Sequence, residues 1–161
     1  MANTASLCTS FLSELMTGTH NFGVAPIRAA TTADTFKGAL YFASATIDAS
    51  TTAYSTTGEV TNTSGSGYTA GGATVTNANA PSSTNSSATA GVAYWTPSAS
   101  LQWTALTITT AFDSLLLYNS TQSNKAVSVF TFGSQTISAG TFTLTMPSNT
   151  TTTALLRLST T

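Results

Sequence analysis

The spacing of apolar residues changes once along this chain, and the change limits the folds open to it. Four apolar residues near the start form a single helical stripe: Leu7, Phe11, Leu12 and Leu15. This stripe predicts one short helix at about residues 6–17, ended by the glycine that follows. From residue 36 onward, apolar residues alternate with polar ones, which is the period of a β-strand. The chain is therefore predicted to be mainly β, with one short N-terminal helix.

Alternating runs bounded by turn residues predict the individual strands. The expected strands cover 36–47, 59–60, 72–76, 92–95, 101–108, 114–118, 126–132, 141–146 and 154–158. Turns are expected at 119–120, 133–134, 139–140 and 147–149, and a loop or loosely held ribbon at 77–91. Short strands at this spacing are typical of a jelly-roll-like antiparallel β-sandwich, here as a single domain over 1–161. The residues expected in its core are Phe36, Leu40, Trp103, Leu106, Leu116, Val127, Val129, Phe142 and Leu144.

Charged residues are scarce. Four Lys and Arg and five Asp and Glu make up 6% of the 161 residues, against about 25% in an ordinary soluble domain. Ser and Thr fill the polar positions instead. A hydroxyl surface suits a protein that packs against copies of itself or against partners, because few charges must be desolvated on assembly. A secreted or repeat-derived Ser/Thr-rich β-domain is the alternative interpretation.

The scarcity of charge also argues against some partners. The four basic residues are scattered and the net charge is −1, so we expect no nucleic-acid binding. No apolar run is long enough for a membrane-spanning helix, and the first residues lack the basic start of a secretory signal. The single cysteine, Cys8, has no partner for an intrachain disulfide, which fits synthesis and assembly in a reducing cytoplasm.

The inventory of reactive side chains predicts no enzyme, no metal and no cofactor. His20 is the one histidine, and its turn-like context favours a surface or packing role over catalysis. Zinc has no ligand set with one His and one Cys, and Cys8 beside the helical stripe is expected to fill the core. A paired-carboxylate site would need acids that converge in space, and a turn or strand-end role is favoured for each acid. The acids considered are Asp34, Asp48, Glu59 and Asp113.

Three other features have both a functional and a plain interpretation. The glycine-rich stretch 65–72 lacks the Gly-Lys-Ser/Thr ending of a phosphate loop, so backbone turning is expected. Trp95 and Trp103 are expected to pack in the core rather than to form a sugar-stacking platform. The hydroxyl-rich tracts 77–89 and 150–153 are expected to be exposed edge material rather than adhesive surfaces.

Several segments together resemble a family of small, mostly uncharacterised virion structural proteins of tailed bacteriophages. The matching elements are the helix ending near Gly18-Thr19-His20-Asn21-Phe22, Asp34-Thr35-Phe36-Lys37-Gly38-Ala39-Leu40-Tyr41, Gly58-Glu59-Val60, Gly65-Ser66-Gly67-Tyr68-Thr69-Ala70-Gly71-Gly72-Ala73, Leu117-Tyr118-Asn119, 125–133, 139–144 and 155–158. The Gly-Tyr-Thr-Ala-Gly-Gly stretch is the most specific. The sequence departs from the family in having fewer charged residues and a longer Ala/Ser/Thr-rich stretch at 77–90.

The resemblance implies a non-enzymatic protein located in the virion. Within it, the expected function is a capsid decoration (cement) protein that binds and stabilises the shell of major capsid protein, as a homo-oligomer with a homotrimer favoured. The alternative is a tail, connector or host-contact component, fibre-like and able to bind carbohydrate. The residues of the shell interface are not identified by the sequence.

Overall fold

A computed structural model of the protein describes residues 3–16, 18–22, 33–60, 65–84 and 91–159. The described chain is mainly β, in two antiparallel sheets: five strands in the order β1-β7-β6-β2-β3, and three in the order β4-β5-β8. The elements are β1 (Ser6–Leu7), α1 (Thr9–Met16), β2 (Phe36–Phe42), β3 (Ala73–Thr74), β4 (Ser82–Ser83), β5 (Val92–Trp95), β6 (Leu101–Asn119), β7 (Lys125–Leu144) and β8 (Leu156–Ser159).

The predicted helix of 6–17 is not formed as a whole. Ser6 and Leu7 are a strand instead, paired antiparallel with Val129 and Ser128 of β7. The helix α1 begins only at Thr9, because the N–H of the preceding residue, Cys8, donates to the Val127 carbonyl of β7. Ser6 and Leu7, which the apolar stripe placed in the first helical turn, therefore pair with β7 instead. A short helix has little stability of its own, so strand pairing at these residues is preferred.

The hairpin of β6 and β7 dominates the fold and differs from the prediction. The expected strands 101–108 and 114–118 are one strand, and so are 126–132 and most of 141–146. The turns expected at 133–134 and 139–140 are wrong, because β7 continues through both. The register with β6 shifts near each of them, so these residues form bulges that bend the ladder without reversing the chain.

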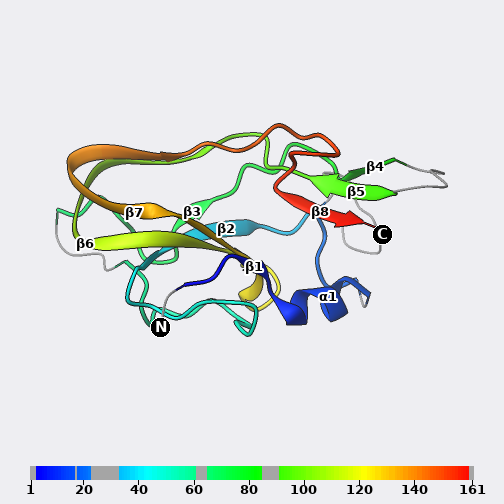
Figure 1. Ribbon diagram of the computed structural model, residues 1–161, viewed down its shortest axis with the longest axis horizontal. Coiled ribbons are helices and arrows are strands. Elements are labelled where there is room, and N and C mark those ends of the chain that lie inside the picture. Colours follow the sequence, from blue (N-terminus) through cyan, green and yellow to red (C-terminus); the bar gives the residue numbers. More distant parts are fainter. Residues whose placement is uncertain (1–2, 17, 23–32, 61–64, 85–90, 160–161) are drawn as a thin grey trace.

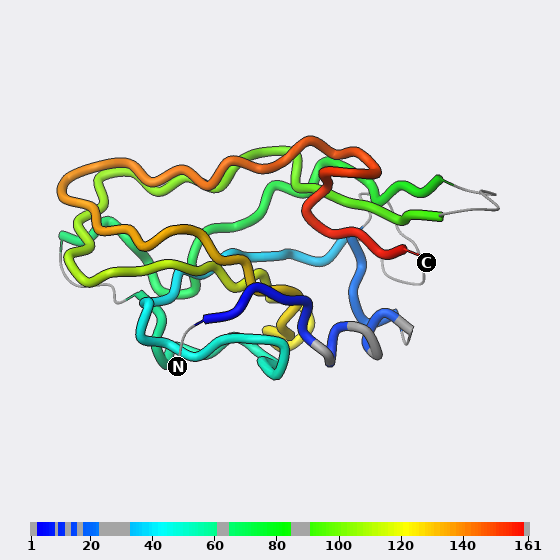
Figure 2. Tube along the Cα trace, viewed as in Figure 1, coloured from blue at the N-terminus to red at the C-terminus, as the bar shows by residue number. Residues whose placement is uncertain are grey.

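Because of these bulges, the long hairpin folds back over itself. Figure 1 shows both strands bending together at the left and returning as a second layer, and Figure 2 shows the same two passes in the Cα trace. We call residues 112–119 and 125–132 the near half of the hairpin, and residues 101–110 and 135–144 the far half. The near half pairs with β2, and the far half lies above it.

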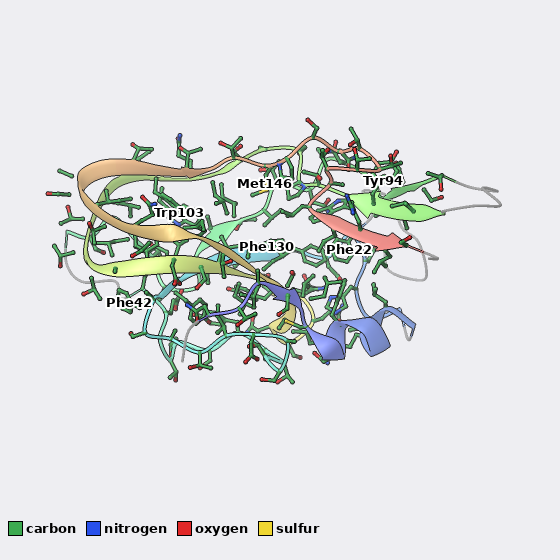
Figure 3. All side chains as sticks on the ribbon, viewed as in Figure 1. Phe22, Phe42, Tyr94, Trp103, Phe130 and Met146 are labelled. Carbon is green, nitrogen blue, oxygen red and sulfur yellow. The ribbon has the colours of Figure 1, made fainter. Side chains whose placement is uncertain are left out.

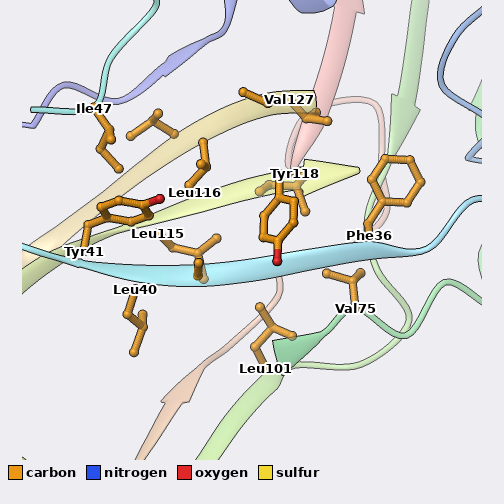
Figure 4. Packing of buried hydrophobic residues seen from close by; sticks show 14 of the residues in the cluster. Phe36, Leu40, Tyr41, Ile47, Val75, Leu101, Leu115, Leu116, Tyr118 and Val127 are labelled. Atoms are coloured by element: carbon orange, nitrogen blue, oxygen red, sulfur yellow. The ribbon is translucent and has the colours of Figure 1, made fainter. Parts of the chain in front are cut away.

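The core lies between these layers and around β2 (Figure 4). Seven residues expected to be buried are buried: Phe36, Leu40, Trp103, Leu106, Leu116, Val127 and Val129. The expectation for Phe142 and Leu144 is wrong, since both are only partly buried. They lie on the far half of β7, where the described chain places no further strand beyond them.

Of the remaining expected strands, one forms with its predicted bounds and the others differ from their predicted bounds. Segment 92–95 is β5, while 72–76 keeps only Ala73–Thr74 and 59–60 supplies a single bridge between Glu59 and Tyr41. Segment 77–91, expected to be a loop or a loosely held ribbon, contains the two-residue strand β4 in its described part. A turn forms as expected after Asn119, whereas the one expected at 147–149 lies later, as a bend at 149–150 and a turn at 151–153.

Candidate functional site

The structure places the single histidine in a buried polar cluster beside α1. His20 Nε2 lies 2.7 Å from Glu14 Oε2, and His20 Nδ1 lies 3.1 Å from Asn119 Nδ2. The second oxygen of Glu14 forms an ion pair with Lys125. The imidazole also packs edge-on against the ring of Phe11, with the centroids 4.9 Å apart. His20 therefore has a packing role, one of the two roles that its sequence context favoured.

Asp34 completes this cluster from the other side of Asn119. Its Oδ2 accepts hydrogen bonds from Asn119 Nδ2 at 2.7 Å and from the Asn21 N–H at 2.9 Å. Both Asp34 and Asn119 are buried. We call the group Glu14, His20, Asp34, Asn119 and Lys125 the His20 cluster. It joins α1, the turn after α1, the approach to β2 and the β6–β7 turn.

The geometry of the His20 cluster favours a structural role over catalysis. Both ring nitrogens of His20 have partners, and neither partner is a hydroxyl or thiol that a general base would activate. Burial opposes ionisation of Glu14, but hydrogen bonds from Lys125 and His20 outweigh it and lower the pKa of Glu14 below its ordinary value. The cluster therefore docks α1 by a charge-assisted contact.

A second buried cluster is centred on Glu59. Its carboxylate accepts hydrogen bonds from Tyr54 Oη at 2.7 Å, from Tyr68 Oη at 2.8 Å and from the Gly71 N–H at 2.7 Å. Tyr118 Oη donates to the Gly71 carbonyl at 2.8 Å. We call these five residues the Glu59 cluster. It holds the glycine-rich stretch against β2 and the near half of β6.

The tyrosines of this cluster are donors and not acids of catalytic strength. Burial, and next the neighbouring Glu59, raise the pKa of Tyr118 to about 12. The same causes raise the pKa of Tyr54 and of Tyr68 well above the ordinary value. These phenols therefore stay protonated at neutral pH, and Glu59 keeps its donors.

The glycine-rich stretch turns the backbone, as the sequence predicted, and also allows close packing. Gly67 has a φ of +71°, and a Cβ there would lie 2.3 Å from the Ala105 carbonyl oxygen. Gly72 has a φ of +69°, and a Cβ there would lie 1.9 Å from the Gly38 carbonyl oxygen. Any side chain at either position would collide with the backbone of β6 or β2, so the stretch is fitted to this sheet rather than to a phosphate.

The remaining acids, Asp48 and Asp113, each have a hydrogen-bond partner within the chain. Asp48 caps its own turn through Ser50, and Asp113 accepts a hydrogen bond from Asn3 Nδ2 at 2.8 Å. Across the described ranges, no three His, Cys, Asp or Glu side chains gather into a group able to hold a metal ion. The four acids considered from the sequence therefore lie in separate surroundings.

Cys8 and the two tryptophans are core residues, as the sequence predicted. Burial, aided by Asp48 and Glu14, raises the pKa of the Cys8 thiol to about 11, so it is not a reactive thiolate at neutral pH. Trp95 packs against Phe22, and Trp103 lies between the two passes of the hairpin, stacked on Phe142 (Figure 3). Both indoles are buried, so they form no exposed sugar-stacking platform.

The sequence did not reveal an apolar cleft between α1 and the β4-β5-β8 sheet. The cleft has a volume of about 240 Å³. Phe11, Phe22 and Trp95 form part of its wall, and Leu158, an exposed large apolar side chain, lies at β8. Its residues come from segments separated by more than a hundred positions, so no local sequence pattern marks it.

The outer edge of β7 is the second feature that the sequence did not specify. Beside β6, β7 has β1 as its other neighbour, and β1 meets it only at Ser128 and Val129. From Phe130 to Leu144 the second edge of β7 meets no described strand. Thr141 and Thr143 are exposed on this stretch.

No protein-family model, no curated protein and no solved structure matches the chain. The resemblance to tailed-bacteriophage virion proteins therefore stays a prediction. The segments that carry it supply most residues of both buried clusters, among them His20, Asp34, Glu59 and Tyr68. Among the described residues, no helix has the length and apolar character needed to cross a membrane.

Proposed function

We propose that the protein is a structural component of a tailed-bacteriophage particle, a capsid decoration (cement) protein that binds and stabilises the shell of major capsid protein. The observation that carries this proposal is the use of charge in the fold. The charged groups of the described chain are mostly engaged with internal partners, which leaves hydroxyl and apolar groups for contact with other proteins.

Of the eight charged side chains in the described ranges, all except Lys37 support this. Glu14 and Lys125 pair with each other, Asp34 and Glu59 are buried among donors, and the Arg157 guanidinium donates to the Thr152 carbonyl. Asp48 and Asp113 also accept hydrogen bonds from within the chain. Binding through the remaining surface would require little desolvation of charge.

A long uncharged region adds to this. No Asp, Glu, Lys or Arg occurs between Lys125 and Arg157, a region that contains most of β7. Its exposed side chains are mainly Thr, Ser and Gln. Such a surface is suited to a repeated contact on a lattice, where many weak attachments act together.

Two finer points belong to the same proposal. The two passes of the hairpin, with β2 and the small sheet, would constitute a jelly-roll-like β-sandwich. The protein would act as a homo-oligomer, with a trimer at a three-fold site of the shell as the favoured arrangement, because a closed ring of copies grips several shell subunits at once.

The test is the response of attachment to salt. Particles carrying the protein are washed at rising ionic strength, and the bound fraction is measured on quantitative gels. At about 1 M salt, exposed charge pairs are screened within about 3 Å. We expect retention throughout, because binding through hydroxyl and apolar groups does not depend on ion pairs. Release by salt alone would contradict the proposal.

Copy number separates the cement role from its alternative. Hundreds of copies per particle are expected for a decoration protein, whereas about a dozen or fewer would identify a tail, connector or host-contact component. Labelled antibody on intact particles provides the same distinction by location, on the capsid or at the tail.

A further inference from the structure

The unpaired edge of β7 is unusual for a monomeric protein. An unpaired edge presents a row of free N–H and C=O groups, and monomeric proteins usually guard it with Lys, Pro or a covering segment. The stretch from Phe130 to Leu144 contains no charged residue and no proline. Bulges interrupt it near 133 and 139, which leaves 140–144 as the part of β7 without a bulge. The register with β6 is continuous from Phe142, opposite Trp103, to Leu144, opposite Leu101, and it shifts on the β6 side between Trp103 and Leu106.

The apolar side chains of this part of β7 are less buried than those of the β6 residues that they face. An additional strand beside β7 would cover them. On β6, Leu101 and Trp103 are 3% and 6% exposed. Their β7 partners, Leu144 and Phe142, face the same side and are only partly buried. A strand added beyond β7 would flank these two side chains as β7 flanks those of β6.

We propose that segment 140–144 of β7 pairs antiparallel with the same segment of a second copy of this chain, so that the sheet continues from one copy into the next. A second copy fits because the edge carries no charge that would repel its own duplicate. In self-pairing, Thr141 and Thr143 would face the same residue types across the junction, a favourable cross-strand pairing. The contact is the same patch on both copies, as a two-fold interface requires. This inference rests on the proposed function, where the junction would join neighbouring oligomers on the shell.

The test compares two double variants on the same outer face of the hairpin. Thr141→Lys with Thr143→Lys puts two charges on the edge strand, while the control, Gln102→Lys with Thr104→Lys, puts two charges one strand inward. All four side chains are exposed, so both variants should fold. Self-association is measured by sedimentation, and backbone hydrogen exchange at 140–144 is measured at low and high protein concentration.

We expect the wild type to self-associate, with exchange at 140–144 slowing as concentration rises. The edge variant should associate at least about tenfold more weakly, because like charges would face each other across the junction, while the control should stay close to wild type. Equal weakening in both variants would show that the outer face, and not the edge, is the contact. Exchange at 140–144 that is independent of concentration would also overturn the proposal, as would protection that arises only on shell binding, which would make the shell protein the occupant.

The same variants separate this inference from the proposed function. If the edge variant is monomeric but still binds purified shells, the edge pairing stands and the cement role stands with it. If the wild type self-associates through the edge but leaves shell stability unchanged, the cement role fails while the edge pairing is upheld.

Discussion

The two halves of the β6–β7 hairpin are continuous in the chain but differ in what covers them. In the near half every residue of β6 from Ser114 to Asn119 is buried, whereas in the far half exposed and buried residues alternate. The near half has the far half on one side, and on the other side α1 and the segment that follows β2 (Figure 1). The far half has a core on one face only. A strand's burial is therefore set by its two faces separately, and one strand can anchor the fold at one end and offer a surface at the other.

The largest expected effect compares one leucine from each half. Leu116→Ala removes a fully buried side chain from the near half and should lower the free energy of unfolding by about 2–5 kcal/mol. Leu144→Ala in the far half should cost about 1–2 kcal/mol, because the side chain is only partly buried. Urea denaturation of both variants provides the measurement. Equal losses would show that the two halves do not differ in packing.

Removing the centre of the Glu59 cluster should have the next largest effect. Glu59→Ala leaves the hydroxyls of Tyr54 and Tyr68 and the Gly71 N–H without their acceptor, at a cost of about 1–3 kcal/mol. Tyr54→Phe is the matched control, since it removes one of the three hydrogen bonds and should cost less. A larger loss from Tyr54→Phe than from Glu59→Ala would mean that the Tyr54 hydroxyl, and not the carboxylate, holds this part of the near half.

The His20 cluster predicts a dependence of stability on acid pH. Because the folded-state pKa of Glu14 is lowered, its stabilising contribution is complete above the unfolded pKa of about 4.3 and is lost as the pH falls through the folded pKa. Thermal denaturation between pH 7 and pH 3 should therefore show a steeper loss in the wild type than in Glu14→Gln. Parallel curves for the two proteins would rule out this role for Glu14.

The smallest expected effects again contrast the two halves. Ser128→Ala removes a buried hydroxyl that donates to the Ser6 carbonyl at 2.9 Å, and should cost about 1 kcal/mol through the loss of that hydrogen bond. Thr143→Ala on the far half changes an exposed side chain and should stay within about 0.5 kcal/mol. Chemical denaturation resolves this difference at low concentration, where self-association does not contribute.

The sequence predicted much of the fold and little of the candidate sites. The sequence predicted β5 with its bounds, but it predicted β2 too long, because the strand ends at Phe42 and not at residue 47. Of the seven hairpin residues expected in the core, five are buried. The sequence missed that His20 and Asp34 would meet through Asn119, because these residues are far apart in the chain and come together only when β6 lies between β2 and β7. The wrong turn predictions at 133–134 and 139–140 have a similar origin, since Gly, Ser and Ala there permit a local departure from the ladder without deciding its form.

By itself the sequence determined the β character of the chain. Alternating apolar residues lie on a single face when the backbone is extended, and they do not when it is helical, so only a strand can bury them together. It also determined the scarcity of charge, and with it the kinds of contact that the surface can make. The tertiary structure alone decided that four expected strands would be two, that the hairpin would fold over its own near half, and that the β7 edge would be left open. Those outcomes depend on pairing between distant segments: a departure from regular pairing becomes a bulge where a partner strand continues beside it, and a turn where none does.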